Sequence, residues 1–251
     1  MSWLLFVVLL LAAALTGGNF WLLFALGWLG SKLLGKIWGW NMGANHERAV
    51  TEQTDAPAMA AVEVSTTPDV PVPFGYKISW AAIRCDAPER VIAALRPSLR
   101  QPANWTSGVA RAYGRSGEVF VSPPLEGFVL VVGFIDDGRT ADLAGAFSEV
   151  QFFASHRVSG YYQWEKYLHG QRVRRYCCED CVLETDEGTL TPEEQMLGFG
   201  RFSPDGSAWP DEEDVLAIAA AWGIDPKFEH KTYPPDTGWL CALYGAEKGV
   251  M

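Results

Sequence analysis

The distribution of apolar and polar residues divides the chain into three parts. Residues 3–29 contain no charged side chain, and an α-helix needs about 20 apolar residues to cross the core of a bilayer. Residues 41–73 lack aromatic side chains and show no lasting helical or strand period. From Phe74 onwards, short strand-like and helix-like segments with apolar residues alternate along the chain. We therefore predict an N-terminal membrane anchor (1–40), a flexible linker (41–73) and a soluble acidic domain (74–251).

Two alternatives to a single transmembrane helix need weighing. A cleaved signal peptide has a basic N-terminal region and a small-residue cleavage site, but Met1 and Ser2 carry no side-chain charge and residues 12–14 offer only a poor site. A helical hairpin turning at Gly17 and Gly18 would have arms of about 13 residues, which are too short to cross unaided. We therefore expect a single-pass helix.

Charge bears on the orientation of the anchor and on the partners of the domain. Lys32, Lys36 and Arg48 all follow the apolar segment, which by the positive-inside rule places the domain in the cytoplasm. Five cysteines, an odd number, fit a reducing compartment. The chain has 20 Lys and Arg against 30 Asp and Glu, and nearly all of these lie beyond the anchor. An acidic domain disfavours nucleic acid and favours either simple solvation or a basic protein partner.

Periodicity within residues 74–251 predicts a mixture of strands and short helices. The predicted strands cover residues 76–84, 117–122, 128–134 and 149–154. Predicted helices follow a capping box formed by Asp86 and Glu89, run from Thr140 to Phe147 and from Ser159 to Leu168, begin at Thr191-Pro192, and run from Pro210 to Trp222. This pattern favours an α+β fold with a single mixed or antiparallel sheet.

The stretch RRYCCEDC (174–181) holds three of the five cysteines. Cys178 and Cys181 have the spacing of zinc ligands, but a zinc site needs four donors and no second pair follows. A redox CxxC would open a helix, whereas strand-like residues follow here. We interpret the stretch as a hairpin with its bend at Glu179-Asp180, so that Cys178 and Cys181 face each other across it. Metal binding by these two cysteines stays the alternative.

One candidate pocket follows the strand 149–154. A polar pair at the end of a strand can line a pocket, and His156 and Arg157 precede an aromatic segment that contains Trp164. The competing interpretation is a histidine bonded to backbone and an aromatic face packed in the core. The sequence contains no GxSxG, HExxH or GxxxxGK[ST] motif, and we predict no catalytic residue and no cofactor.

Three segments together resemble a group of uncharacterised bacterial proteins: FVSPPLEGFVLVVG (120–133), SEVQFFASHRVSGYYQW (148–164) and DEGTLTPEEQMLGF (186–199). The likeness covers about residues 76–225, so the resemblance implies that the anchor and linker are additions in this chain. Because no activity is settled for the group, the resemblance implies no catalytic residue. Some relatives lie in toxin–immunity neighbourhoods.

These observations favour a membrane-anchored, cytoplasm-facing binding module. An immunity-like capture of a basic protein is one concrete version of that hypothesis. The alternative is an enzyme of unrecognised type with a pocket near His156, Arg157 and Trp164. A third possibility is a purely structural envelope protein, in which the anchor matters more than the domain.

Overall fold

The structure is a computed structural model, and it describes residues 62–114, 117–203 and 208–243. The predicted anchor (1–40) and the linker up to residue 61 lie outside the described residues. Within the described ranges, no helix combines the length and the apolar character needed to cross a membrane.

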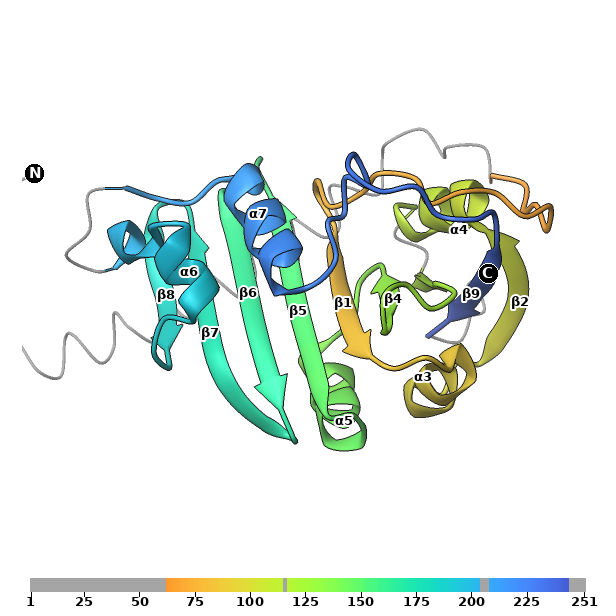
Figure 1. Cartoon of the computed structure of the whole chain (residues 1–251), viewed down its shortest axis with the longest axis horizontal. Coiled ribbons are helices and arrows are strands. Elements are labelled where there is room, and N and C mark those ends of the chain that lie inside the picture. Colours follow the sequence, from red (N-terminus) through yellow and green to blue (C-terminus); the bar gives the residue numbers. More distant parts are fainter. Residues whose placement is uncertain (1–61, 115–116, 204–207, 244–251) are drawn as a thin grey trace, which may run out of the picture. The chain divides into compact units, whose positions relative to one another are not determined.

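The strands of the described residues form one antiparallel sheet, in the order β2-β9-β3-β4-β1-β5-β6-β7-β8 (Figure 1). Their bounds are β1 Ser79–Arg84, β2 Leu99–Asn104, β3 Glu118–Val121, β4 Phe128–Val132, β5 Glu149–His156, β6 Tyr161–Leu168, β7 Gln171–Glu179, β8 Val182–Glu187 and β9 Thr237–Ala242. The predicted α+β class with a single sheet is confirmed, and the sheet is antiparallel throughout.

Helices cover both faces of this sheet. Their bounds are α3 Pro88–Leu95, α4 Trp105–Ala112, α5 Asp137–Ala146, α6 Pro192–Met196 and α7 Glu212–Trp222, with a 3₁₀ turn, η2, at Phe199–Phe202. One core holds Trp80 and Phe153 together with buried residues of α4, η2 and α7, and the opposite core holds Ile83 and Val131 together with those of α3 and α5. The central strands β1 and β4 are therefore covered on both sides, which explains the continuous apolar run over 128–132.

Two predicted helix starts are wrong. Helix α3 has Ala87 at its N-cap, with no side-chain hydrogen bond, so Asp86 lies one residue too early to form the predicted capping box. Helix α5 is capped by Asp136, whose carboxylate accepts from the backbone N–H of Arg139. Thr140 lies within the first turn and donates its hydroxyl to the Asp136 carbonyl. In contrast, the starts of α6 and α7 lie close to their predicted positions.

The predicted helix from Ser159 to Leu168 is also wrong, because this segment forms strand β6 between β5 and β7. Its residues alternate between faces: Trp164 joins the core under α6 and η2, whereas Gln163 and Glu165 are bonded to each other on the opposite face. Aromatic residues favour strands as well as helix faces, so the local pattern was ambiguous. Strands β2 and β9 and helix α4 were not predicted.

Residues 62–73, assigned above to the linker, contact the domain through backbone and side-chain groups. The Ser65 carbonyl accepts from the Asn104 N–H at 2.7 Å. The Asp69 carboxylate accepts from the N–H groups of Trp105 and Thr106 at 2.6 and 3.0 Å, at the start of α4. Val64 and Val72 also pack against the core. Because the apolar residues of this segment keep no helical or strand period for more than a few residues, periodicity did not predict the contact, and the structure attaches the segment to the domain ahead of Phe74.

Candidate binding site at the tip of the β7–β8 hairpin

The stretch 171–187 forms the predicted hairpin, but its turn lies one residue later than predicted. Glu179 pairs with Val182, and the two residues between them, Asp180 and Cys181, have φ values of 48° and 58°. A two-residue turn with both φ values positive matches the right-handed twist of the strands. Cys178 is opposite Leu183, so the expectation that Cys178 and Cys181 face each other across the hairpin is wrong.

A cleft of about 260 Å³ lies beside this turn. We call it the tip cleft, and it is lined by Arg157, Val158, Gly160, Tyr162, Cys178, Asp180, Cys181, Trp209 and Pro210. The Asp180 N–H donates to the Ser159 carbonyl at 3.2 Å, which joins the hairpin turn to the turn between β5 and β6. Gly160 has φ +60°, and a Cβ there would lie 3.1 Å from the Asp180 nitrogen. This close approach of two backbones shapes one wall of the tip cleft.

The tip cleft has an aromatic and acidic character. Trp209 keeps 44% of its surface exposed although it is a large apolar residue. The pKa of Tyr162 is raised by burial and by the nearby carboxylates of Glu212 and Asp211. Arg157 is the basic residue in the lining, and its guanidinium lies 3.8 Å from the Glu212 carboxylate. The positive charge of Arg157 is therefore partly balanced within the protein.

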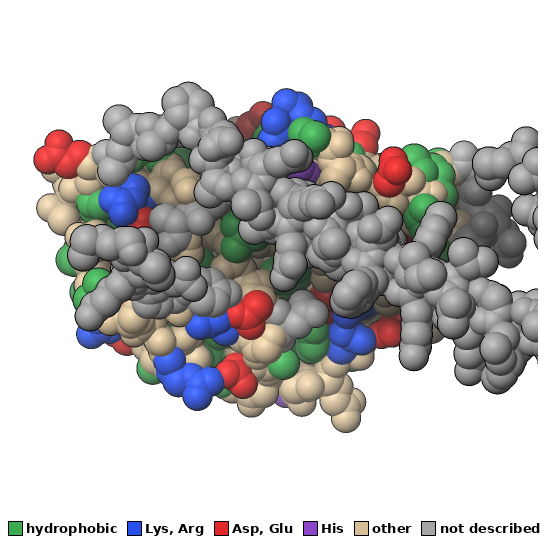
Figure 2. All heavy atoms as spheres, turned by 180° about the vertical axis from the view of Figure 1, so that it is seen from behind, with side chains coloured by type: hydrophobic (Ala, Val, Ile, Leu, Met, Phe, Trp, Pro, Cys, Tyr) green, Lys and Arg blue, Asp and Glu red, His purple; other side chains and the backbone are tan. Residues whose placement is uncertain are grey.

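The carboxylates at the tip of the hairpin have no partner among the described residues. Glu179, Asp180 and Glu184 are exposed, and no hydrogen bond or ion pair in the described part of the chain involves their side chains. The basic residues of the same hairpin bind elsewhere, since Arg172 and Arg175 pair with acids of β6 and β8. On the reverse of the molecule, the visible Lys and Arg side chains lie interspersed with Asp and Glu (Figure 2).

The structure does not bring His156, Arg157 and Trp164 into one pocket. Arg157 lines the tip cleft. The Nδ1 atom of His156 lies 3.0 Å from the Ser159 hydroxyl, which also donates to the His156 carbonyl. Among the described residues no carboxylate contacts His156, so this histidine and serine lack the third group that orients the base in a catalytic triad. What the structure does bring together is Arg157 with Cys178 and Cys181.

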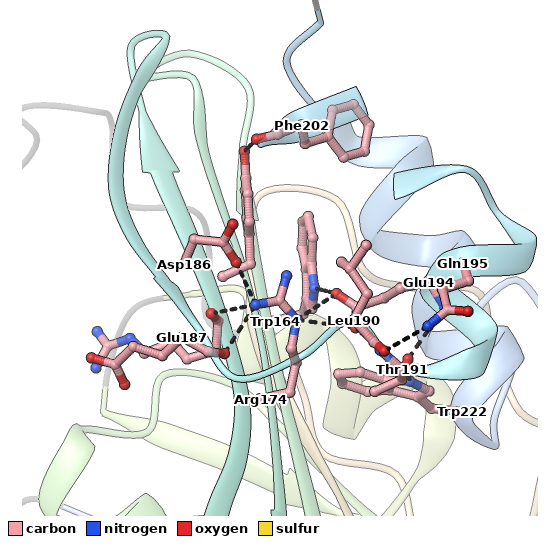
Figure 3. A network of polar contacts seen from close by, with 12 residues as sticks. Trp164, Arg174, Asp186, Glu187, Leu190, Thr191, Glu194, Gln195, Phe202 and Trp222 are labelled. Atoms are coloured by element: carbon pink, nitrogen blue, oxygen red, sulfur yellow. Dashed lines mark hydrogen bonds and ion pairs between the residues drawn. The ribbon is translucent and has the colours of Figure 1, made fainter. Parts of the chain in front are cut away.

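Trp164 belongs to a different environment at the other end of the hairpin (Figure 3). Its indole N–H donates to the Glu194 carboxylate at 2.8 Å, and the Arg174 Nε binds the two oxygens of the same carboxylate at 2.8 and 3.0 Å. The Thr191 N–H adds a third donor at 2.8 Å. Arg174 and Glu194 are 1% and 0% exposed in their side chains. This site has no access from solvent, and it holds α6 against β6 and β7.

The cysteines of the described residues do not form a metal centre. Within the described ranges, no three His, Cys, Asp or Glu side chains are grouped as metal ligands would be. Burial raises the pKa of Cys178 to about 11 and also raises the pKa of Cys177, which disfavours the thiolate form that binds metals or acts as a nucleophile. Cys181 is the exposed cysteine.

Trp209 and Glu184 complete the site, and sequence reasoning missed both. Trp209 lines the tip cleft together with Asp180 and Cys181, which lie more than 20 residues earlier in the chain, and Glu184 lies on β8 beyond the turn. The acid-rich composition of 179–187 was the one available signal.

Comparisons of the chain with protein-family models, with curated proteins and with solved structures found no match. The fold and the tip cleft therefore carry the functional argument.

Proposed function

We propose that the domain is a protein-binding module that receives a basic segment of a partner at the tip of the β7–β8 hairpin. The observation that carries the proposal is the set of three exposed carboxylates at the tip of the hairpin, Glu179, Asp180 and Glu184, which have no partner among the described residues. Asp180 also lines the tip cleft, which contains a half-exposed tryptophan. Lys and Arg side chains suit both features, because carboxylates bind their charged groups and an indole face attracts cations.

Long-range charge supports the same partner. The chain has a formal net charge of −10, which accelerates encounters with basic proteins and repels nucleic acids. Among the described residues that line the tip cleft, Arg157 is the one that opposes a cationic ligand, and Glu212 already neutralises part of its charge. An immunity-like role, in which the acidic tip masks the basic surface of another protein, is the concrete version of this proposal.

The membrane location forms the second half of the proposal. Residues 1–40 would hold the module at the bilayer, with the domain in the cytoplasm. A reporter fused to the C-terminus and active only in the cytoplasm tests the orientation. Recovery of the intact chain in the supernatant after high-speed centrifugation without detergent would refute the anchor, and reporter activity outside the cytoplasm would refute the orientation.

The binding proposal is tested with two variants of equal net charge. The tip variant carries Glu179→Gln, Asp180→Asn and Glu184→Gln, and the control variant carries Glu63→Gln, Glu89→Gln and Glu229→Gln, which neutralise exposed acids elsewhere. The probe is a lysine-rich and valine-rich decapeptide, and the full-length chain is studied in detergent micelles. We expect the tip variant to weaken binding about tenfold, or about 1.4 kcal/mol, and the control variant to stay within about twofold of the unmodified chain.

Salt provides the second measurement. Binding that depends on these surface charges should weaken steeply as ionic strength rises. An equal loss in both variants would mean that the peptide responds only to net charge, and the proposed site would then be abandoned. Binding that is indifferent to salt would count equally against it.

A further inference from the structure

The two edges of the sheet differ in whether they can accept another strand. Strand β2 forms one edge, and it contains Pro102, which has no backbone N–H. The segment 62–73 also reaches this edge, since the Asn104 N–H donates to the Ser65 carbonyl. Proline and a covering segment are two devices that protect a sheet edge from pairing. The β2 edge is therefore closed to a further strand.

The β8 edge has neither device. In the sheet β8 pairs with β7 alone, and its sequence, VLETDE, contains no proline. The Arg174 guanidinium donates a hydrogen bond to the Glu187 carbonyl. Within the described ranges, no other group outside the β7–β8 ladder bonds to the backbone of β8. Among the described residues, the outward N–H and C=O groups over 182–186 are thus open to a partner strand, and their regular spacing is interrupted at Glu184, the extra residue where the register against β7 shifts. An extended peptide that adds to such an edge gains affinity from main-chain hydrogen bonds.

The side chains of β8 indicate which strand would fit. Three of its six residues are acidic: Asp186 and Glu187 are paired with Arg174 and Arg172, whereas Glu184 has no partner among the described residues. Val182 is 55% exposed. Two copies of this chain pairing β8 with β8 would bring like charges opposite each other, which is destabilising. A strand that alternates basic and β-branched residues would instead place all of its cations on one face of the extended sheet, beside Glu184, and its β-branched side chains on the other face.

From this edge we infer that the partner binds as an added β-strand along β8, with its end at the tip cleft. The inference rests on the proposed function and specifies its geometry: a basic segment in extended conformation, held by backbone bonds along β8 and by its cations at Glu179, Asp180 and Glu184. The order of the sheet would then extend by one strand beyond β8.

The test uses the full-length chain in detergent micelles and three versions of one probe, a decapeptide of alternating Lys and Val. Two versions carry N-methyl groups, one on the Lys residues and the other on the Val residues. Alternate N–H groups of a strand point to opposite edges, so one version blocks the edge facing β8 and the other blocks only the outer edge. We expect one version to bind at least tenfold more weakly and the other to stay within about twofold of the unmethylated peptide. Hydrogen exchange should slow at the amides of 182–187 when the unmethylated peptide binds.

The outcomes separate this inference from the proposed function. Equal binding of the two methylated peptides, strong or weak, would overturn the added strand, and so would unchanged exchange in β8. If the tip variant still lost binding in that case, the acidic tip would stand as a binding site without strand addition. Sedimentation that showed dimers sensitive to substitutions in β8 would mean that a second copy occupies the edge, and would also refute the inference.

Discussion

The two ends of the β7–β8 hairpin use the same residue types in opposite ways. At the end next to α6, which we call the hairpin root, Arg174 and Glu194 are buried and bonded on all sides (Figure 3). At the tip, Glu179 and Asp180 are exposed and without a partner among the described residues. Arg174 and Glu179 both lie on β7, about 17 Å of strand apart at about 3.4 Å per residue, so a single hairpin holds both.

The difference between the root and the tip indicates which carboxylates of an acidic protein are available for binding. A charge can be buried only if its hydrogen bonds and its opposite charge are supplied from within, so the carboxylates at the root are committed to the fold. A charge in water needs no internal partner, and it therefore remains available to an external one. Substitutions at the root should change stability, whereas substitutions at the tip should change binding.

The largest effect is expected from Glu194→Ala. This change removes the acceptor for Trp164, for the Thr191 N–H and for Arg174, and it leaves a buried guanidinium short of one carboxylate. We expect a loss of about 3–5 kcal/mol in the free energy of unfolding, measured by urea unfolding with tryptophan fluorescence. The adjacent Glu193→Ala is the control and should cost no more than about 0.5 kcal/mol.

A small loss in Glu194→Ala would contradict this interpretation of the root. Asp186 also bonds to Arg174, at 2.5 Å, and it is the group that would compensate. The double variant Glu194→Ala with Asp186→Asn distinguishes compensation from an error in the geometry. If the double variant is also stable, the buried network is not what holds α6 to the sheet.

The next largest effect on stability is expected at Gly188, in the bend that follows β8 at the hairpin root. Gly188 has φ +81°, and a Cβ there would lie 2.1 Å from the Val173 carbonyl oxygen. We expect Gly188→Ala to destabilise the domain by about 2 kcal/mol or more, because both the backbone conformation and the contact become strained. The matched control is Gly145→Ala in α5, where no atom lies within 4 Å of the new Cβ. There helix propensity should give a gain of about 0.5–1 kcal/mol. The same loss at both positions would contradict the strained contact at Gly188.

The reactivity of the cysteine thiols provides a further comparison between the exposed tip and the buried parts of the domain. Cys181 is exposed in the turn, whereas Cys85, Cys177, Cys178 and Cys241 are buried. Burial raises the pKa of Cys178 to about 11 and that of Cys241 to about 12, so their thiolate fractions at pH 8 are small. We expect a maleimide or disulfide reagent to label one thiol of the folded chain rapidly, and Cys181→Ser to abolish that fast phase. A fast phase that survived in Cys181→Ser would show that the region around β7 opens readily.

The sequence predicted this hairpin better than it predicted the site. Strand composition on both sides of a short acidic bend was enough to place β7 and β8, and Pro192 located a helix start. Periodicity could not separate a strand from a helix over 161–168, because aromatic residues suit both. It also could not show that Trp209 and Asp180 line one cleft, since that arrangement depends on how distant segments pack. Strand β9, beside β2, depends on the same long-range pairing.

The smallest expected effect on stability belongs to the tip variant Glu179→Gln, Asp180→Asn and Glu184→Gln. None of these side chains has a bonding partner among the described residues, and neutralising them relieves repulsion between neighbouring carboxylates. We therefore expect the free energy of unfolding to change by no more than about 0.5 kcal/mol per substitution, in the stabilising direction, while peptide binding falls about tenfold. This opposition between stability and affinity is what distinguishes a binding surface from a structural one. A variant that lost stability and affinity together would show that the tip acids support the fold, and the contrast between the two ends of the hairpin would fail at its central point.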